Sequence, residues 1–461
     1  MTEISRSEAG AENLTITAAA IETVVERMKA TGGKAICFVT GVPGAGKTLA
    51  GLNIACGRMA KDIGEDATFL SGNGPLVDVL REALKRDVRA RKGRPTAGDG
   101  DARHLAERSP DKLVQNVHHF RDEYIDRSQV PSEHVVVFDE AQRAWNQPMT
   151  ADFMRKKRGQ AGFDQSEPAF LLSVMDRHPD WCVVVCLIGE EQEINRGEAG
   201  ISEWVRALQG DLGHWQVHLP PHLFVDGSGL DAELRLHLSQ RVATPNAALH
   251  LAVSVRSFRA ETVSAYVAAV LGTDAETAVA SRPATADFPI WRTRDLAAAR
   301  AWLRDRRRAG ERSGLLASSN ALRLKPEGLY VKADIDVCNW FLNGTEDVRS
   351  SNSLEDAATE FDVQGLELDW TCVAWDLNLR RDNGWQAREF RGTRWQAIHG
   401  DAGVLGRADY VRNAYRVLLT RARQGMVIFV PRGDAADATR PPADYDAVDA
   451  WLADCGVAAL A

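Results

Sequence analysis

No apolar run in this 461-residue sequence has the length needed to cross a membrane. The longest such run, "WCVVVCLI" at 181–188, has the length of a buried strand. Basic residues are not in excess either, because 56 Lys and Arg stand against 64 Asp and Glu, which gives a net charge of −8. This balance excludes a polybasic nucleic-acid binder, so any binding to nucleic acid has to come from local patches.

Cysteine is sparse and scattered. The seven cysteines include one close pair, Cys182 and Cys186, which has no His or Cys partner at the spacing of a metal site. We therefore expect buried free thiols in a reducing compartment. The start of the chain, "MTEISRSEAGAENL", is polar and acidic, unlike a secretory signal. These features predict a cytoplasmic protein with no membrane partner.

Short β-branched runs alternate with stretches of helical periodicity in the first half of the chain. Strands are predicted at 34–40, 66–72, 134–139 and 181–188, and helices at 14–30, 47–60 and 75–92. This alternation is typical of an α/β fold with a doubly wound parallel sheet, which binds ligands at the carboxyl ends of its strands. The pattern restarts downstream, so we predict a domain boundary near residue 250.

The stretch "GVPGAGKT" at 41–48 follows a predicted strand and opens a predicted helix. It fits G-x-x-x-x-G-K-[ST], in which glycines turn backbone N–H groups toward phosphates and the helix N-terminus adds a positive dipole. Lys47 would bridge the β- and γ-phosphates, and Thr48 would ligate Mg²⁺. The residues expected to hold nucleotide are Gly41, Gly44, Ala45, Gly46, Lys47, Thr48 and Leu49.

Two acids end the strand "VVVFDEAQ", about ninety residues after the glycine loop. Asp139 would hold Mg²⁺, and Glu140 would polarise the attacking water. A pair of acids at a strand end is often only solvated, but its place on a predicted central strand favours catalysis. Gln192, at the end of the next strand in "LIGEEQEI", carries an amide that can bond the γ-phosphate and report its loss.

The whole set of motifs resembles that of superfamily 1 DNA/RNA helicases, and in detail the Schlafen-group-3-like helicase domain family of bacterial proteins, over residues 35–430. Motifs I to VI resemble, in order, "GVPGAGKT", "TFLSGNGPLVDVLREAL" (motif Ia), "VVVFDEAQRAW", "LIGEEQEINRGEAG", "VSVRSF", "TEFDVQGLELDW" and "YRVLLTRARQG". The last two discriminate best, because other P-loop classes seldom carry a Q-G-x-E strand followed by L-T-R-A-R near the chain end.

The resemblance implies two tandem RecA-like P-loop NTPase domains with parallel sheets, at 35–250 and 251–431. A helical lead-in would precede them at 1–34, and a linker with a short helix would follow at 432–461. Nucleotide would lie in a cleft between the two domains.

The resemblance also assigns roles to residues of that cleft. Arg256 and Arg421 would be arginine fingers, for which a planar cation is chemically suited. Glu367 would contact the ribose, and Gly365 would bring backbone close to the γ-phosphate. Gln142 would link motif II to motif III or to the γ-phosphate.

Some assignments stay open at this point. Arg423 is a rival to Arg421, separated only by register, and either finger could instead form a surface ion pair. No Gln precedes the glycine loop where an adenine-reading glutamine is expected, so base specificity is open, and motif IV has Val255 where an aromatic is usual. About forty residues precede the loop, where many relatives carry a further domain, so we expect any effector on a separate polypeptide.

Three basic stretches are candidates for nucleic-acid binding, at 81–94, at 154–159 in a predicted loop, and at 379–395. The third combines guanidinium groups for phosphate with flat rings for bases, as single-strand binding requires. Its candidates are Arg388, Arg391, Arg394, Trp385 and Trp395, to which the resemblance adds Ser71, Asn73 and Thr359. A solvated face or a protein contact is the alternative for any such run.

These observations predict an ATPase that uses ATP and Mg²⁺ to translocate on or unwind DNA or RNA, with a single strand as the expected partner. The alternative is a nucleotide-dependent regulatory ATPase. It would gate a partner effector, such as a separately encoded nuclease in antiviral defence, without unwinding. A small-molecule P-loop kinase explains neither the second domain nor motifs V and VI.

Overall fold

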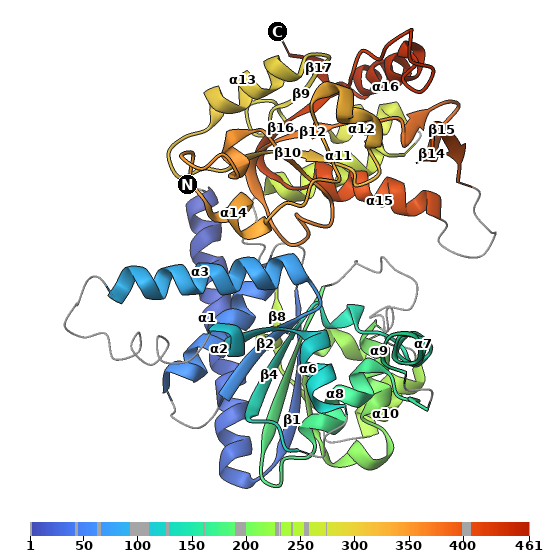
Figure 1. Ribbon diagram of the computed structural model, residues 1–461. Coiled ribbons are helices and arrows are strands. Elements are labelled where there is room, and N and C mark those ends of the chain that lie inside the picture. Colours follow the sequence, from blue (N-terminus) through green and yellow to red (C-terminus); the bar gives the residue numbers. More distant parts are fainter. Residues whose placement is uncertain are drawn as a thin grey trace. The chain divides into compact units, whose positions relative to one another are not determined.

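The computed structural model describes residues 2–41, 45–61, 66–92, 110–125, 129–159, 162–189, 200–225, 230, 232–240, 243–252, 258–272, 274–398 and 407–460. The chain forms two compact units, Met1–Arg256 and Ser257–Ala461 (Figure 1). Each unit has its own parallel sheet and its own buried core.

The first unit is built on one sheet with the strand order β3-β2-β4-β5-β1-β6-β7, and β8 pairs with β1. All described pairings in it are parallel, so the carboxyl ends of β1, β2, β4 and β5 share one edge. The strands are β1 (Lys34–Gly41), β2 (Asp66–Ser71), β3 (Val114–Asn116), β4 (Glu133–Asp139), β5 (Cys182–Gly189), β6 (Gln216–Leu219), β7 (Ala243–Pro245) and β8 (His250–Leu251).

Helices cover both faces of this sheet (Figure 1). One face packs against α1 (Thr2–Thr31), α2 (Lys47–Lys61) and α3 (Gly74–Lys92), and the other against α6 (Val117–Tyr124), α8 (Glu167–Met175), α9 (Gly200–Ala207) and α10 (Ala232–Gln240). The alternation along β1 explains this, because Ile36 and Phe38 enter one core while Cys37 and Val39 enter the other. The remaining helical segments are α5 (Pro110–Leu113), α7 (Gln147–Arg158), η1 (Ala141–Arg143), η2 (Gly210–His214), η3 (Pro221–Phe224) and η4 (Ala247–Leu249).

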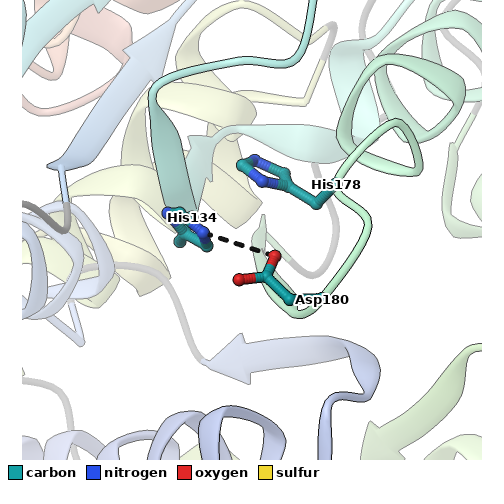
Figure 2. Close-up of side chains that lie close together, drawn as sticks. All are labelled: His134, His178 and Asp180. Carbon is teal, nitrogen blue, oxygen red and sulfur yellow. Dashed lines mark ion pairs between the residues drawn. The ribbon is translucent and has the colours of Figure 1, made fainter.

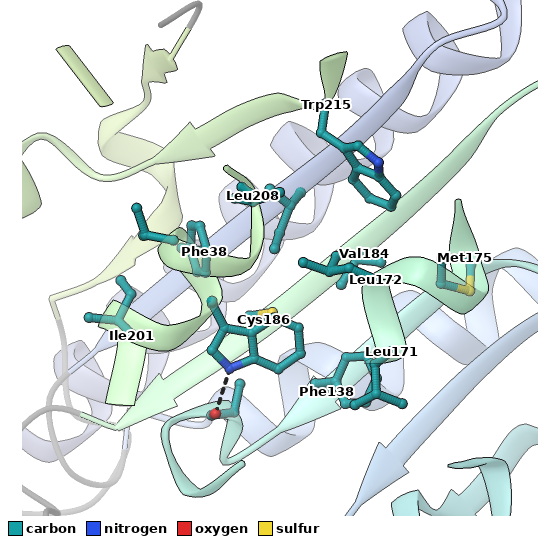
Figure 3. Close-up of a cluster of buried hydrophobic side chains, with 14 of the residues drawn as sticks. Phe38, Phe138, Leu171, Leu172, Met175, Val184, Cys186, Ile201, Leu208 and Trp215 are labelled. Atoms are coloured by element: carbon teal, nitrogen blue, oxygen red, sulfur yellow. Dashed lines mark hydrogen bonds between the residues drawn. The ribbon is translucent and has the colours of Figure 1, made fainter. Parts of the chain in front are cut away.

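One of these cores lies beneath the turn that follows β4. Figure 3 shows side chains from β1, β4, β5, α8 and α9 gathered around buried aromatic rings. Trp204 is fully buried there, and its indole N–H donates a hydrogen bond of 2.8 Å to the carbonyl oxygen of Ala141. The core thus reaches the backbone of motif II.

Helix α2 lies unusually close to the sheet. A Cβ atom at Gly51 would stand 2.7 Å from Leu187 Cδ1, 2.9 Å from Val137 Cγ1 and 3.0 Å from a ring carbon of Phe69. Only glycine fits without displacing these core side chains. The absence of a side chain at Gly51 therefore sets the distance between α2 and the strands β2, β4 and β5.

The second unit contains a parallel sheet with the order β11-β10-β12-β16-β9-β17. Its strands are β9 (Ile290–Thr293), β10 (Ser313–Ala317), β11 (Ala357–Ala358), β12 (Leu368–Ala374), β16 (Ala422–Phe429) and β17 (Ala458–Ala459). Helix α13 (Leu296–Arg306) packs on one face, and α11 (Phe258–Val270), α12 (Ala275–Ser281), α15 (Arg407–Leu419) and α16 (Pro442–Asp454) pack on the other. Shorter pieces are η5 (Leu322–Glu327), α14 (Val337–Leu342) and η6 (Ser351–Ser353).

An antiparallel ribbon of three strands, called the ribbon from here on, extends this unit between β12 and α15. It consists of β13 (Leu379–Arg381), β14 (Trp385–Arg391) and β15 (Arg394–Ala397). With two parallel sheets in tandem, the chain has the predicted α/β class and RecA-like build.

The sequence predicts a linker and a short helix at 432–461. In the structure, α16 and β17 of this segment pack into the second unit. Tyr445, Val448 and Leu452 on α16 are fully buried, and the Tyr445 hydroxyl donates to Asp376 at 2.9 Å. Strand β17 then adds an edge to the sheet beside β9. This segment therefore completes a core.

Strand β8, at the predicted domain boundary near residue 250, pairs with β1 of the first sheet. The structure corrects two local expectations. The basic stretch 154–159 is not a loop but the end of α7, which Asn146 caps by accepting from the Met149 N–H at 3.1 Å and which ends at Gly159 with φ +69°. The segment before β16 is the helix α15, because Val411, Tyr415 and Leu418 recur at helical spacing and are buried.

All seven cysteines are free, and five of them are buried, as expected from their apolar surroundings. Among the described helices, none combines the length and apolarity of a membrane span.

Two alanine substitutions in α2 test the role of close packing. Gly51→Ala should destabilise the first unit, because overpacking costs about 1–3 kcal/mol and outweighs the helix-propensity gain of about 1 kcal/mol. Gly57→Ala, in the same helix with no atom within 4 Å of its added Cβ, should instead stabilise by about 0.5–1 kcal/mol. Urea unfolding followed by circular dichroism measures both. Equal shifts of the two midpoints would show that packing at Gly51 does not matter.

Candidate functional site

The glycine loop begins at Gly41, the last residue of β1. Gly41 pairs with Leu251 of β8, and a Cβ on Gly41 would lie 2.8 Å from the Leu251 Cβ. Only glycine therefore fits at the start of the loop. Gly46, the last glycine of the motif, has a φ of +82°, a conformation that glycine adopts without strain. Gly44 lies outside the described residues.

Helix α2 begins at Lys47, so the motif's cation stands in the helix's first turn. The Lys47 ammonium donates to the carbonyl oxygen of Gly41 at 2.7 Å, which draws the two ends of the loop together. Ala45 is buried, whereas the Leu49 side chain is half-exposed. The amino end of α2, with its lysine, is therefore arranged as an anion site.

Thr48 connects this loop to motif II. Its hydroxyl lies 3.1 Å and 3.2 Å from the two carboxylate oxygens of Asp139, the last residue of β4. The two residues are 91 positions apart in the sequence. A hydroxyl and a carboxylate at this spacing are oxygen ligands of the kind Mg²⁺ prefers.

The Asp139 carboxylate is buried, and its charge is poorly compensated. Burial and the neighbouring charge of Glu140 raise its pKa to about 7, although the Thr48 hydroxyl, a backbone N–H and Lys47 act in the opposite direction. A buried carboxylate that binds its proton this tightly would gain from a divalent cation. The donor set thus fits a Mg²⁺ ion.

Glu140 occupies a strained turn directly after β4. Its φ and ψ of 53° and 44° are left-handed, which costs a non-glycine residue roughly 1–2 kcal/mol. The Glu140 carboxylate accepts from the Gln142 amide at 2.5 Å and lies 3.6 Å from the Arg143 guanidinium. Strain of this kind is concentrated at functional sites, and here it turns an acid away from the strand at the sheet edge.

Gln142 also joins the ends of two strands. While its amide N–H group donates to Glu140, its amide oxygen accepts the N–H of Gly189 at 3.0 Å. Gly189 ends β5, the strand that leads into the predicted motif III. A change at Glu140 can therefore reach the end of β5 through one side chain.

Two buried residues that belong to no sequence motif, Arg121 and Glu167, hold the turn after β4 in place. The Glu167 carboxylate accepts from the Trp145 backbone N–H at 3.1 Å and from Arg121 at 3.3 Å. Arg121 is fully buried, and its guanidinium lies over the rings of Trp145 and Phe153. Burial raises the pKa of Glu167, although the Trp145 N–H and Arg121 lower it. This buried ion pair fixes the chain at the end of motif II.

A second cluster of side chains that the sequence does not predict lies just before the glycine loop. It consists of Thr40, His222 and His250. The Thr40 hydroxyl lies 2.8 Å from His250 Nδ1 and 3.3 Å from His222 Nε2. The two imidazole rings pack edge to face with centroids 4.6 Å apart. Nothing in the sequence spacing signals this contact, because parallel pairing brings the three segments together.

In the second unit, the predicted motifs V and VI lie side by side. Leu368, which opens β12, donates its N–H to the Arg421 carbonyl oxygen at 3.0 Å, just before β16. Glu367 and Arg421 are therefore close although 54 positions separate them. Gly365 has a φ of +74°, which accounts for glycine in the turn before them.

The two rival arginines differ in their surroundings. Arg421 is half-buried, and its Nε donates to the Val417 carbonyl oxygen at 3.0 Å. The Arg423 side chain is exposed on β16. Arg256 and Gln192 lie outside the described residues, so their roles stay predictions.

The sequence pattern of the Schlafen group 3, DNA/RNA helicase domain matches residues 34–432, most of the chain. The chain belongs to this family. No curated protein matches it. A solved structure that does match is the crystal structure of arterivirus nonstructural protein 10 (helicase), with 12% identity and a TM-score of 0.28. That match covers 93% of this chain but only 62% of the viral one, and so weak a likeness adds nothing to the fold seen directly.

In this Schlafen group 3 helicase domain, the candidate nucleic-acid residues have structural contacts as well. Ser71 ends β2 beside Asp139, and its hydroxyl accepts from the Asn73 N–H at 3.3 Å. Asn73 in turn accepts from the Leu76 N–H at the start of α3. The Thr359 hydroxyl donates to Asp362 at 2.6 Å. Their binding roles stay predictions.

The ribbon's two tryptophans pack inward. The Trp385 indole N–H donates to the Val270 carbonyl at 3.1 Å, and its ring stacks on Trp375. The Trp395 indole donates to the Thr439 carbonyl at 2.8 Å. Both indoles thus anchor the ribbon to the second unit, unlike rings that stand free to stack on bases. Arg391 and Arg394 are exposed and face each other in register, while Arg388 is half-buried.

All three basic stretches carry ion pairs within the described residues, and on the ribbon Arg391 lies 2.8 Å from Glu389 and Arg380 lies 2.6 Å from Asp444. On α3, Lys85 bonds Asp111 at 2.8 Å and Arg86 bonds Glu82 at 2.9 Å. On α7, Arg155 and Lys156 both bond Asp152. Part of each positive charge is therefore compensated locally.

The raised pKa of Asp139 gives a stability prediction with a definite sign. Because the folded pKa is about 7 and the ordinary value 3.8, the protonated acid favours folding, and that contribution is lost as pH rises through 7. Asp139→Asn should therefore raise the stability of the metal-free, nucleotide-free protein by at least about 1 kcal/mol at pH 8. The gain should shrink between pH 7 and 4. Thermal unfolding at several pH values in the presence of a chelator measures it.

A matched control is Asp152→Asn on α7. Hydrogen bonds from Lys156 and Arg155 lower the pKa of this exposed carboxylate, so its removal should not stabilise the protein. A destabilised Asp139→Asn at pH 8 would contradict the assignment of Asp139 as an uncompensated buried charge.

Proposed function

We propose that this helicase domain is a Mg²⁺-dependent ATPase that couples hydrolysis to movement along DNA or RNA, or to separation of their strands. The observation that carries the proposal is the contact between Thr48 and Asp139. It unites a phosphate-binding helix terminus with a buried acid at the carboxyl edge of a parallel sheet. That combination is typical of P-loop NTPases.

Each residue of this edge has a proposed chemical task. Backbone N–H groups of the loop and the Lys47 ammonium would neutralise the β- and γ-phosphates. Mg²⁺, held by Thr48 and Asp139, would supply further positive charge to the phosphate oxygens. Glu140 would accept a proton from the attacking water, once its carboxylate is free of Gln142.

Residues of the second unit would complete the site. Glu367 directly precedes Leu368, whose N–H donates to the Arg421 carbonyl oxygen. A guanidinium such as that of Arg421 or Arg256 suits the charge that develops on the transferred phosphoryl group. Glu367 would contact the ribose, and Gly365, Gln192 and Gln142 would respond to the γ-phosphate. Cycles of binding and hydrolysis would then move the units and step the nucleic acid.

The contact between Glu140 and Gln142 favours a second candidate function. The carboxylate of this proposed base accepts a hydrogen bond from the Gln142 amide at 2.5 Å and lies 3.6 Å from the Arg143 guanidinium. Such an acid is restrained, so basal turnover would be slow until a ligand rearranges the turn. A regulatory ATPase would behave in this way, sensing nucleic acid and gating a separately encoded effector such as an antiviral nuclease in the cytoplasm.

An ATPase assay across nucleic acids tests the proposed coupling. Single-stranded DNA or RNA should stimulate hydrolysis severalfold, and duplex should stimulate it less, because grip on one strand is the step coupled to turnover. Strand displacement measured with the same protein separates the two functions. Stimulation with displacement supports a helicase, and stimulation without it supports the regulatory ATPase or a translocase. A hydrolysis rate that no DNA or RNA changes would refute both the helicase and the regulatory ATPase.

Two substitutions test the proposed chemistry of the site. Glu140→Gln should keep ATP binding but lower kcat by at least about 100-fold, because the base is lost while the phosphate contacts remain. Lys47→Ala should weaken ATP binding and abolish turnover. Fluorescence titration of nucleotide and phosphate release measure the two effects. The control Asp152→Asn, on α7 of the same unit, should leave both unchanged. Near-normal turnover by Glu140→Gln would assign the base elsewhere.

A further inference from the structure

Within the described residues, one group of side chains has the composition of a metal site and lies away from the nucleotide edge. His134, His178 and Asp180 each offer one ligand atom, and these atoms lie within 4.8 Å of one another (Figure 2). His134 stands at the start of β4, and the other two lie in the turn between α8 and β5. Since β4 rises about 3.3 Å per residue, His134 is roughly 17 Å from Asp139.

The rings are held in place by packing. The centroids of His134 and His178 lie 4.2 Å apart, and the Trp181 ring lies 4.7 Å from His134. The His178 side chain is almost fully buried, while Asp180 is about half-exposed. The cluster is thus preformed on the imidazole side and open to solvent on the carboxylate side.

A backbone contact fixes the protonation of His178. Its Nε2 lies 3.0 Å from the Glu133 carbonyl oxygen, which can only accept, so Nε2 carries the proton. Nδ1 then has the free lone pair. A ligating histidine commonly donates its other ring N–H to a backbone carbonyl in this way.

His134 and Asp180 do not form a hydrogen bond with each other. His134 Nε2 and Asp180 Oδ1 are 3.6 Å apart, too far for a hydrogen bond, and the buried Nδ1 of His134 has no hydrogen-bond partner in the structure. The three groups thus converge without bonding one another closely. A cation between them would satisfy the Asp180 charge and the imidazole lone pairs together.

We propose that His134, His178 and Asp180 bind one Zn²⁺ ion, with water completing the coordination. Two imidazoles and a carboxylate suit zinc better than Mg²⁺, which prefers oxygen ligands. Tetrahedral bonds of about 2.1 Å place ligand atoms roughly 3.4 Å apart, so separations of up to 4.8 Å must contract by up to about 1.4 Å. The Asp180 side chain is about half-exposed, and its carboxylate, which accepts the Trp181 backbone N–H, would make that movement. Bound zinc would tie the start of β4 to the turn before β5.

Direct titration with Zn²⁺ tests the site in the full chain, stripped of metal by a chelator and supplied with excess Mg²⁺. The wild type should bind one equivalent of Zn²⁺ and unfold at a higher temperature with it. His134→Gln and Asp180→Asn should each weaken binding at least tenfold and lose the thermal shift. Co²⁺ in place of zinc should give the visible absorption of a four-coordinate site in the wild type and not in these two variants.

A matched control is His214→Gln, which removes another surface imidazole paired with a carboxylate, since His214 Nε2 lies 2.8 Å from Asp176. It should bind zinc as the wild type does. Circular dichroism without metal checks that each variant is folded, and Asp180→Asn, at an exposed position, should fold normally. Absence of stoichiometric zinc in the wild type, or equal affinity in His134→Gln and Asp180→Asn, would overturn the proposal and leave a stacked histidine pair with a surface charge.

Discussion

The hydrogen bond from the Thr48 hydroxyl to the Asp139 carboxylate is the contact on which the rest of the first unit's chemistry depends. It can form only because α2 approaches the sheet closely, and that approach is possible only because Gly51 has no side chain. The same closeness buries Asp139 and raises the pKa of its carboxylate. One packing distance therefore both assembles the proposed metal ligands and creates the uncompensated charge that a metal would satisfy.

Strands β4 and β5 carry proposed functional residues at both of their ends. At their carboxyl ends, Gln142 joins Glu140 to Gly189. At their amino ends, His134, His178 and Asp180 converge. The buried pair of Arg121 and Glu167 holds the chain that leaves the first of these strands. The turn carrying Glu140 can thus be strained because its neighbours on both sides are fixed.

The sequence predicted those features that depend on local pattern. The parallel sheets follow from alternating apolar runs, and the glycine loop and DEAQ strand follow from motifs whose chemistry dictates their residue types. Contacts between distant segments that belong to no motif escaped prediction. Arg121 and Glu167 carry no motif, and the histidines of the proposed zinc site are 44 positions apart, so only the pairing of β4 with β5 brings them together.

Aromatic residues in basic stretches show a further limit of sequence patterns. Trp385 and Trp395 alternate with arginines as in a single-strand binding surface, yet each indole N–H is bonded to a backbone carbonyl of the second unit. A pattern of residue types cannot tell an exposed ring from one that anchors a strand, because both satisfy the same alternation. The α7 helix was missed for a related reason, since its caps are the single residues Asn146 and Gly159, which are equally common in loops.

The anchoring of the ribbon gives the second unit an optical property. The rings of Trp375 and Trp385 are stacked with centroids 5.2 Å apart, and Trp451 stands edge-on to Trp385 at 6.5 Å. Indoles this close share their electronic excitations, so their combined circular dichroism in the near and far ultraviolet differs from that of isolated tryptophans. The chain thereby contains a native chromophore pair whose coupling depends on the ribbon staying attached to its sheet.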